Sequence, residues 1–274
     1  MSEDVKTTSV TLNDGAKIPQ VGLGVWQAGG KTKAAVLAAL AAGYRHVDTA
    51  AVYGNEPQVG AAIAESGIPR AEIFVTTKLW NKDQGYDAAL RAFDASLARL
   101  KLEYLDLYLI HWPVAELRLE SWRALEQLHA DKRARSIGVS NFLEPHLRQL
   151  EGVAKVLPAV NQIELTPFLQ RQRTVARCRE LGIAMEAYSP LTRGQRLGHP
   201  VVLALAQQLG RSPAQIMLRW GLQKGFVLLP KSVTPARIAE NAALFDFSLD
   251  AGAISRLDAL EEGLVTGWDP ATQA

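Results

Sequence analysis

Residues 73–110, IFVTTKLWNKDQGYDAALRAFDASLARLKLEYLDLYLI, contain the pattern that decides the fold. The apolar runs Ile73–Thr77 and Leu105–Ile110 are nearly continuous rather than alternating, which is typical of parallel strands that are buried on both faces. Between the two runs, four apolar side chains recur at the spacing of one helix face: Leu90, Phe93, Leu97 and Leu100. The stretch therefore predicts a strand, a helix and a second, parallel strand, which is the repeating unit of α/β proteins.

The same unit recurs along the chain. Short apolar runs predict eight strands, at Val21–Leu23, Arg45–Asp48, Ile73–Thr77, Leu105–Ile110, Ser136–Val139, Ala159–Ile163, Ile183–Ala187 and Phe226–Leu229. Segments with helical periodicity lie between these runs. Ser212-Pro213 predicts the start of a helix, with Ser212 as its N-cap and Pro213 as its first residue. Thr234-Pro235 predicts a second helix start of the same kind.

A hairpin is predicted before the first of these strands. Thr8–Leu12 and Ala16–Ile18 flank Asn13-Asp14-Gly15, and Asp-Gly supplies the positive φ angles that a tight turn needs. We expect this hairpin to cap one end of the main fold.

Eight β-then-α units fit either a closed barrel or an open, doubly wound sheet. An open sheet that binds a dinucleotide carries G-x-G-x-x-G at its first turn. Here Gly22-Leu23-Gly24 is followed by Val25-Trp26-Gln27, so the third glycine is missing. The length of 274 residues is close to that of one complete barrel, and no linker or low-complexity segment divides the chain. We therefore predict an α/β fold in which residues 1–274 form one (β/α)8 TIM barrel domain.

Composition excludes several classes of protein. The formal net charge of +2, with basic residues dispersed, does not suggest a nucleic-acid partner. The single cysteine, Cys178, excludes an intrachain disulfide, and its place within a predicted helix favours a buried structural role. The start, MSEDVKTTSV, lacks the apolar core of a signal peptide, and no apolar run approaches the ~18 residues of a membrane span. We expect a cytoplasmic monomer that has no membrane partner.

Polar residues follow three consecutive predicted strands. Asp48 ends the second strand and Tyr53 lies a few residues beyond it, while Lys78 follows the third strand and His111 the fourth. Taken singly, each residue has an ordinary alternative role. Asp48 could cap a helix or join an ion pair, and Tyr53 could pack in a loop. Lys78 could be a surface lysine, and His111 a hydrogen-bonded structural histidine. The active sites of these barrels lie at the carboxyl ends of the strands. Neighbouring strand ends therefore bring the four side chains within reach of one another.

The four residue types suit the reduction of a carbonyl group. A tyrosine hydroxyl titrates near 10, and we expect Lys78, held by a salt bridge to Asp48, to lower the pKa of Tyr53. His111 would hydrogen-bond and orient the carbonyl oxygen. The phenol would then protonate that oxygen as it becomes an alkoxide on arrival of a hydride. The five histidines are scattered, without H-x-H or H-E-x-x-H, so we expect no metal.

Three tryptophans fall just after predicted strand ends, at Trp26, Trp80 and Trp112. A single tryptophan there would more simply belong to the core, but three on one rim favour an apolar substrate pocket. The segment after Pro113 and the tail after Leu260 are both short. We therefore expect an open pocket that tolerates many small carbonyl compounds.

Several blocks resemble the aldo-keto reductase superfamily in one register, from the first hairpin to about Leu260. They are Gly43–Ala50 with Tyr53–Glu56, Thr76–Trp80, Asp106–Pro113, Ile137–Phe142, Val160–Glu164 and Leu229–Val233. The chain is most similar to the short prokaryotic members typified by 2,5-diketo-D-gluconate reductase. Many relatives have His-Pro where this chain has Thr166-Pro167, which bears on the substrate rather than on the catalytic group.

The resemblance implies NADPH-dependent reduction of aldehydes and ketones, including small dicarbonyls, aromatic or aliphatic aldehydes, keto sugars and keto acids. Tyr53 would be the general acid, Asp48 and Lys78 its tuning partners, and His111 the carbonyl-orienting group. A nucleotide-sensing binding subunit with slow turnover, like the potassium-channel β subunits, is the alternative. A metal-dependent barrel hydrolase is disfavoured because paired histidines are missing from the sequence.

The resemblance also implies a site for NADPH or NADP⁺. Ser140, Asn141 and Gln162 match contacts to the nicotinamide carboxamide, Tyr188 the stacking ring, and Ser189 and Leu191 the pyrophosphate contacts. Lys231, Ser232 and Arg237, with Val233 beside them, match the clamp on the 2′-phosphate, and Glu240 and Asn241 match adenine contacts. Loops after the last two strands are the usual phosphate site of such barrels, and arginine suits bidentate phosphate binding. If the neighbouring motif were absent, Lys231 and Arg237 would be interpreted as ordinary solvated cations on the surface.

Overall fold

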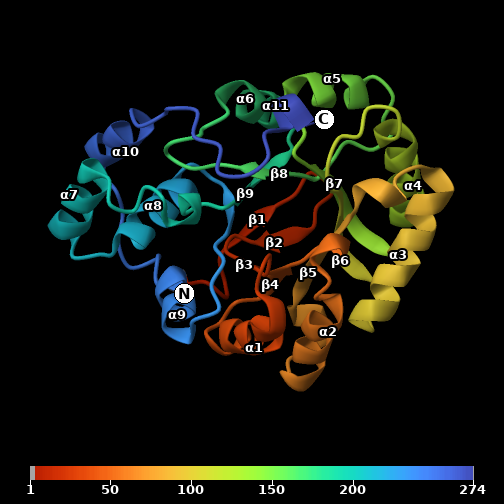
Figure 1. Cartoon of the computed structure of the whole chain (residues 1–274), viewed down its shortest axis with the longest axis horizontal. Helices are drawn as coiled ribbons and strands as arrows, with labels where there is room; N and C mark the ends of the chain where they lie inside the picture. Colours follow the sequence, from red (N-terminus) through yellow and green to blue (C-terminus); the bar gives the residue numbers. More distant parts are fainter. Residues whose placement is uncertain (1–3, 274) are drawn as a thin grey trace.

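The computed structural model describes residues 4–273 and contains a barrel of eight parallel strands (Figure 1). Each strand pairs with the next along the chain: β3 (Leu23–Gly24), β4 (His46–Asp48), β5 (Phe74–Leu79), β6 (Leu105–Ile110), β7 (Ala134–Ser140), β8 (Val160–Glu164), β9 (Ala184–Tyr188) and β10 (Val227–Leu229). A parallel bridge between Val21 and Leu228, with the Gly22 amide donating to the Leu228 carbonyl at 2.8 Å, joins the last strand to the first. The predicted (β/α)8 barrel is confirmed.

Helices surround the strands on the outside of the barrel (Figure 1). They are α1 (Thr32–Ala41), α2 (Glu56–Glu65), α3 (Tyr86–Leu100), α4 (Arg118–Ala130), α5 (Glu144–Glu151), α6 (Gln172–Glu180), α7 (Pro200–Leu209), α8 (Pro213–Gln223), α9 (Pro235–Ala242), α10 (Ala251–Asp258) and α11 (Pro270–Gln273). Short 3₁₀ turns lie at η1 (Gly29–Lys31), η2 (Ala51–Tyr53), η3 (Arg70–Glu72), η4 (Asn81–Asp83) and η5 (Thr192–Gly194). Within residues 4–273, no helix is both long and apolar enough to cross a membrane.

Two helix starts show how local sequence sets these elements. Ser212 caps α8, because its hydroxyl accepts from the Gln215 amide while the Gln215 side chain accepts from the Ser212 amide. Thr234 occupies the same position before α9 but makes no side-chain capping bond. Instead, the Thr234 amide donates to Ser232 Oγ at 3.1 Å. The start of α9 was thus predicted correctly, whereas its expected cap was wrong.

The strands and the inner faces of the helices form the core. Every residue of β5 and β6 is buried, as their continuous apolar character predicts. The ring of Phe93 on α3 packs edge-on against Tyr108 on β6, with ring centres 5.0 Å apart. Gly60 allows α2 to touch α3, because a Cβ at this position would lie 2.0 Å from the Leu100 carbonyl oxygen. Cys178 is buried on α6, as expected.

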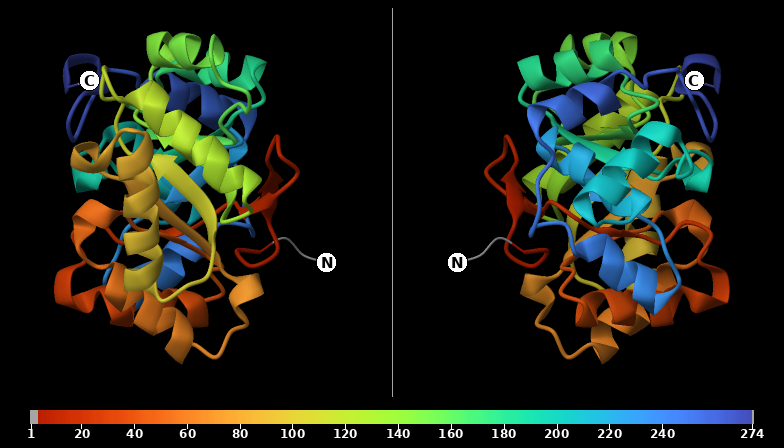
Figure 2. Two further views of the ribbon diagram at one scale, coloured as in Figure 1. Left: turned by 90° about the vertical axis from the view of Figure 1, so that its right-hand side faces the viewer. Right: turned by 90° about the vertical axis from the view of Figure 1, so that its left-hand side faces the viewer.

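The two ends of the barrel differ. The predicted hairpin, β1 (Ser9–Thr11) paired with β2 (Lys17–Pro19), lies across one end (Figure 2). Its side chains Leu12 and Ile18 pack with Phe74, Leu107 and other residues of the barrel interior. The C-terminal segment lies at the opposite end (Figure 2). The hairpin thus covers the end where the strands begin, and the two cavities that concern the predicted site lie at the end where the strands finish.

Candidate active site

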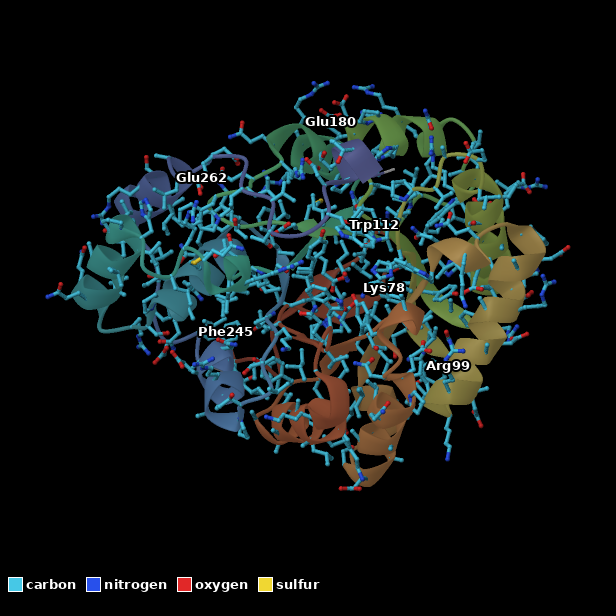
Figure 3. The ribbon with its side chains drawn as sticks, viewed as in Figure 1. Lys78, Arg99, Trp112, Glu180, Phe245 and Glu262 are labelled. Carbon is cyan, nitrogen blue, oxygen red and sulfur yellow. The ribbon has the colours of Figure 1, made fainter. Side chains whose placement is uncertain are left out.

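A buried ion pair lies at the carboxyl ends of β4 and β5. Asp48 is in register with Thr76, so Lys78, two residues further along β5, points to the same face. Lys78 is fully buried and lies near the middle of the molecule in Figure 3. Its Nζ lies 2.7 Å from both Asp48 carboxylate oxygens and 2.8 Å from the Thr49 carbonyl oxygen. The three hydrogens of the ammonium group are thus matched by three acceptors.

Tyr53 and His111 lie directly above this ion pair. The ring centres of Tyr53 and His111 are 5.8 Å apart, and Lys78 Nζ is 5.2 Å from the centre of the Tyr53 ring. Asn141 Nδ2 donates to the His111 carbonyl oxygen at 2.9 Å. The structure therefore brings together the four side chains that sequence reasoning placed on neighbouring strand ends.

The pKa of Tyr53 departs from its ordinary value in the direction opposite to the one predicted. Burial raises the pKa of Tyr53 well above its usual range, and the carboxylates of Asp48 and Glu186 act in the same direction. The predicted lowering by Lys78 fails because that ammonium is already bound to Asp48 and Thr49, while the desolvation of the phenol and the two carboxylates act against it. The phenol therefore stays protonated, which is the form a proton donor needs.

His111 is held in its neutral form. Burial lowers the pKa of His111 well below its usual value, and the positive charge of Lys78 lowers it further. A neutral imidazole has one N–H donor and one acceptor nitrogen. His111 can therefore donate a hydrogen bond to a carbonyl oxygen without carrying a charge.

A second buried acid, Glu186 on β9, was missed by sequence reasoning. Gln162 Nε2 donates to Asp48 Oδ2 at 2.8 Å and to Glu186 Oε2 at 2.7 Å. Burial and the charge of Asp48 raise the pKa of Glu186 to about 8. Glu186 falls within the predicted strand Ile183–Ala187, where a carboxyl among apolar residues was the available signal.

Residues predicted to contact the nicotinamide lie beside this group on β7, β8 and β9. Ser140 Oγ donates to the Gln162 carbonyl oxygen at 2.8 Å, and Tyr188 Oη donates to Asn141 Oδ1 at 2.8 Å. Asn141 and Ser189 have positive φ angles of 64° and 47°, a conformation that non-glycine residues rarely adopt. Such backbone geometry concentrates at functional sites.

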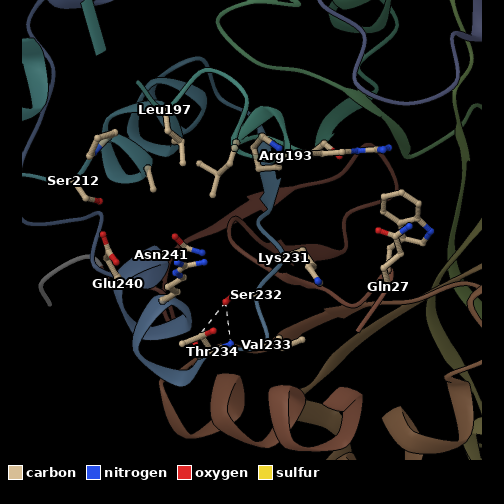
Figure 4. A pocket seen from close by; sticks show the side chains of 18 residues that line it. Gln27, Arg193, Leu197, Ser212, Lys231, Ser232, Val233, Thr234, Glu240 and Asn241 are labelled. Atoms are coloured by element: carbon tan, nitrogen blue, oxygen red, sulfur yellow. Dashed lines mark hydrogen bonds between the residues drawn. The ribbon is translucent and has the colours of Figure 1, made fainter. Parts of the chain in front are cut away.

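Two cavities adjoin at this end of the barrel. One, of about 490 Å³, is lined by Asp48, Tyr53, His111, Ser140, Asn141, Gln162 and Tyr188, together with Trp26, Trp80 and Trp112. The other, of about 590 Å³, is shown in Figure 4 and is lined by Ser189, Leu191, Lys231, Ser232, Val233, Arg237, Glu240 and Asn241. Five residues line both cavities: Trp26, Gln27, Ser189, Arg193 and Lys231. The residues of the predicted cofactor site therefore form one continuous trough.

The C-terminal tail forms one wall of the first cavity, which the sequence did not reveal. Gly267 and Trp268 line the cavity, and the Trp268 ring lies 5.8 Å from that of Trp112. Two contacts hold the tail there. The Thr266 amide donates to Glu164 Oε1 at 3.1 Å, and Arg171 pairs with Asp269 at 2.8 Å. Residues 266–269 therefore add a wall to the pocket that the sequence analysis did not predict.

Potential metal ligands are dispersed in the described part of the chain. Over residues 4–273, no three His, Cys, Asp or Glu side chains gather in an arrangement that would hold a metal ion.

These features agree with comparisons to known proteins, and the chain belongs to the Aldo/keto reductase family, whose sequence model matches residues 20–262. An aldo-keto reductase of Mycolicibacterium smegmatis is 54% identical over 266 residues, which cover 96% of this chain and 97% of that protein. Glyoxal reductase of Bacillus subtilis is 46% identical over 272 residues, which cover 98% of both chains. The crystal structure of a Gox0644 mutant in complex with NADPH has a TM-score of 0.93 and 41% identity, covering 97% of this chain and 98% of that one.

Proposed function

We propose that this chain reduces aldehydes and ketones to alcohols with NADPH, with Tyr53 as the general acid. The observation that carries the proposal is the position of Tyr53 and His111 over the Lys78–Asp48 ion pair, on the wall of a cavity lined by tryptophans. NADPH would supply the hydride that reaches the carbonyl carbon.

Side chains of the protein would orient and then protonate the carbonyl oxygen of the substrate. Neutral His111 would donate a hydrogen bond that orients the oxygen. Tyr53, protonated at neutral pH because its pKa is raised, would donate its proton as negative charge develops on that oxygen. The Lys78 ammonium, 5.2 Å from the phenol ring, would stabilise the phenolate that remains. Asp48 would hold Lys78 in place.

The second cavity suits the dinucleotide. Lys231 and Arg237 have no carboxylate within 4.0 Å among residues 4–273, so both cations are available to phosphate. The N-terminus of α9 adds the positive end of a helix dipole to the same place. Lys231, Ser232 and Arg237 would hold the 2′-phosphate, with Val233 beside them. The remaining contacts would come from Glu240 and Asn241 at the adenine, Ser189 and Leu191 at the pyrophosphate, and Ser140, Asn141, Gln162 and Tyr188 at the nicotinamide.

The first cavity suits small carbonyl compounds with an apolar part. Its walls include Trp26, Trp80, Trp112 and Trp268. The similarity to a glyoxal reductase supports small dicarbonyls as substrates. Aromatic and aliphatic aldehydes, keto sugars such as 2,5-diketo-D-gluconate and keto acids are the other candidates.

The test is a substrate panel at fixed NADPH. We expect nicotinamide absorbance to fall with methylglyoxal, benzaldehyde or 2,5-diketo-D-gluconate, and one alcohol to form for each NADPH consumed. Tight NADPH binding with negligible turnover across the panel would instead support the nucleotide-sensing subunit. The reductase names of its relatives do not favour that alternative.

We further propose that residues 1–274 act as one barrel domain and as a monomer in the cytoplasm. A molecular mass near 29.8 kDa in solution by light scattering supports the monomer, and twice that value contradicts it.

A further inference from the structure

The buried acid behind the catalytic group has an unusual set of partners. Glu186 is fully buried and does not line either of the two adjoining cavities. Its Oε2 accepts from Gln162 Nε2 at 2.7 Å, and the same nitrogen donates to Asp48 Oδ2 at 2.8 Å. An amide nitrogen has two hydrogens, so these two acceptors satisfy both.

This arrangement fixes the orientation of the Gln162 amide. Asp48 is ion-paired to Lys78 through both oxygens, so it accepts hydrogen bonds and faces the amide nitrogen rather than the amide oxygen. A flipped amide would turn its oxygen toward the Asp48 carboxylate, which has no hydrogen to donate. With the nitrogen held from behind, the oxygen of Gln162 is left for the cavity that this residue lines.

Folding alone does not explain an acid at this position. Among the described residues, Glu186 Oε1 is buried and has no hydrogen-bond partner. His46 Nε2 is 3.6 Å from Glu186 Oε1 and hydrogen-bonds instead with Thr76 Oγ1 at 3.1 Å. A buried polar atom without a partner destabilises the folded state. An apolar side chain would avoid that loss, so the acid is better explained by the group it holds.

We propose that Glu186 is a positioning residue: it accepts the second hydrogen of Gln162 and thereby keeps the Gln162 oxygen facing the nicotinamide carboxamide. The inference rests on the proposed function, because it needs a nicotinamide in the first cavity. It concerns a residue that touches neither the substrate nor the cofactor.

The protonation state of Glu186 depends on the groups that surround it. The groups that face it are His46 and Asp48 from β4, Lys78 from β5, Tyr53 from η2 and the uncharged Gln162 from β8, while β10 contributes only apolar residues. With its pKa raised to about 8, Glu186 is a neutral acceptor at pH 7. Ionisation above that pH would place a second negative charge near Tyr53 and hinder formation of the phenolate. The pH profile of the reaction should therefore contain a step from Glu186.

Two variants separate positioning from a structural role. Glu186→Met removes the acceptor, and Glu186→Gln keeps an acceptor oxygen that cannot ionise. Glu56→Gln on α2 is the matched control, since Glu56 is equally buried but pairs with Arg99 and Thr77. The readouts are the NADPH Kd from fluorescence titration, kcat and KM over pH 6–10, and the thermal unfolding midpoint.

For Glu186→Met we expect an NADPH Kd raised ~10-fold, the effect of one lost hydrogen bond. The unfolding midpoint should stay close to that of the wild type, because the variant leaves one Gln162 hydrogen without a partner but also removes the unpaired Oε1. Glu186→Gln should restore the Kd to about twice the wild-type value or less and abolish the step near pH 8. Wild-type affinity in Glu186→Met, or a loss that Glu186→Gln does not rescue, overturns the inference.

The two proposals fail in different ways. A wild-type chain that binds no NADPH overturns the proposed function and this inference with it. An active wild type whose Glu186→Met variant binds NADPH normally overturns the inference alone. If Glu186→Met does not fold, the pH profile of Glu186→Gln decides, and a profile that keeps the alkaline step contradicts the role of Glu186.

Discussion

At the scale of single residues, the pair of Lys78 and Asp48 has two separable roles. Each charge is buried, and each is the principal partner of the other. Removing one member leaves an uncompensated buried charge, which typically destabilises a protein by about 3–5 kcal/mol. Removing both leaves no such charge.

We therefore expect Lys78→Met to lose activity and to unfold at lower denaturant concentration. The double variant Asp48→Asn with Lys78→Met should recover most of the stability but none of the activity, because the phenolate of Tyr53 would still lack a stabilising cation. Chemical denaturation and carbonyl reduction by the same samples check this. Recovery of activity in the double variant would show that Lys78 has no catalytic role.

The positions of these residues could be predicted from the sequence where they follow from strand order alone. Asp48, Lys78 and His111 end neighbouring parallel strands, so their proximity follows from the fold. The pKa of Tyr53 was predicted in the wrong direction because the loss of solvent around a side chain depends on segments far apart in the chain. Glu186 was missed for the same reason, since its partners Gln162 and Asp48 lie 24 and 138 residues before it along the chain.

At the scale of elements, α9 carries the residue that should decide between NADPH and NADH. Arg237 lies on its first turn, beside the second cavity. We expect Arg237→Ala to weaken NADPH binding about 10- to 100-fold and to leave NADH binding nearly unchanged, because only NADPH has a 2′-phosphate. Parallel titrations with both nucleotides measure this, with Arg256→Ala on α10 as a surface-arginine control. Equal losses for both nucleotides would remove the 2′-phosphate assignment.

The C-terminal segment should influence which substrates are accepted. Glu164 and Arg171 hold it against the barrel, and Trp268 lies against Trp112 on the wall of the first cavity. We expect Trp268→Ala to raise KM for benzaldehyde about 3- to 10-fold through the loss of aromatic contact. KM for methylglyoxal, which has no ring, should change little. Equal effects on both substrates would argue against contact between Trp268 and the ring.

The elements themselves were largely predictable from local sequence. All eight strands overlap the apolar runs that predicted them, because a strand buried on both faces needs such a run. The first was placed too early, since β3 shares only Leu23 with the predicted Val21–Leu23. The role of the tail was not predictable, since it depends on a contact between Glu164 and Thr266 across 102 residues. Nothing in the local pattern of the tail indicates that partner.

At the scale of the whole molecule, the two ends of the barrel differ in role, because one is packed against the hairpin and the other carries the predicted site. The hairpin lies across the end where the strands begin (Figure 2). The two adjoining cavities and the predicted catalytic group lie where the strands finish. The missing third glycine after Gly22-Leu23-Gly24 favoured a closed barrel over an open sheet, and the bridge from Val21 to Leu228 confirms the closure. The number and order of the strands were therefore predictable, whereas the shape of the pocket above them was not.

The rate of hydride transfer in a Tyr53→Phe variant tests the central claim most directly. With saturating NADPH and methylglyoxal in a single turnover, we expect the rate to fall about 10²- to 10⁴-fold, the usual contribution of a general acid. The NADPH Kd should stay within about twofold of the wild type, as for one hydroxyl lost outside the binding contacts. Tyr104→Phe, at the start of the strand that leads to His111, should keep the wild-type rate. A Tyr53→Phe variant that transfers hydride as fast as the wild type would contradict the account.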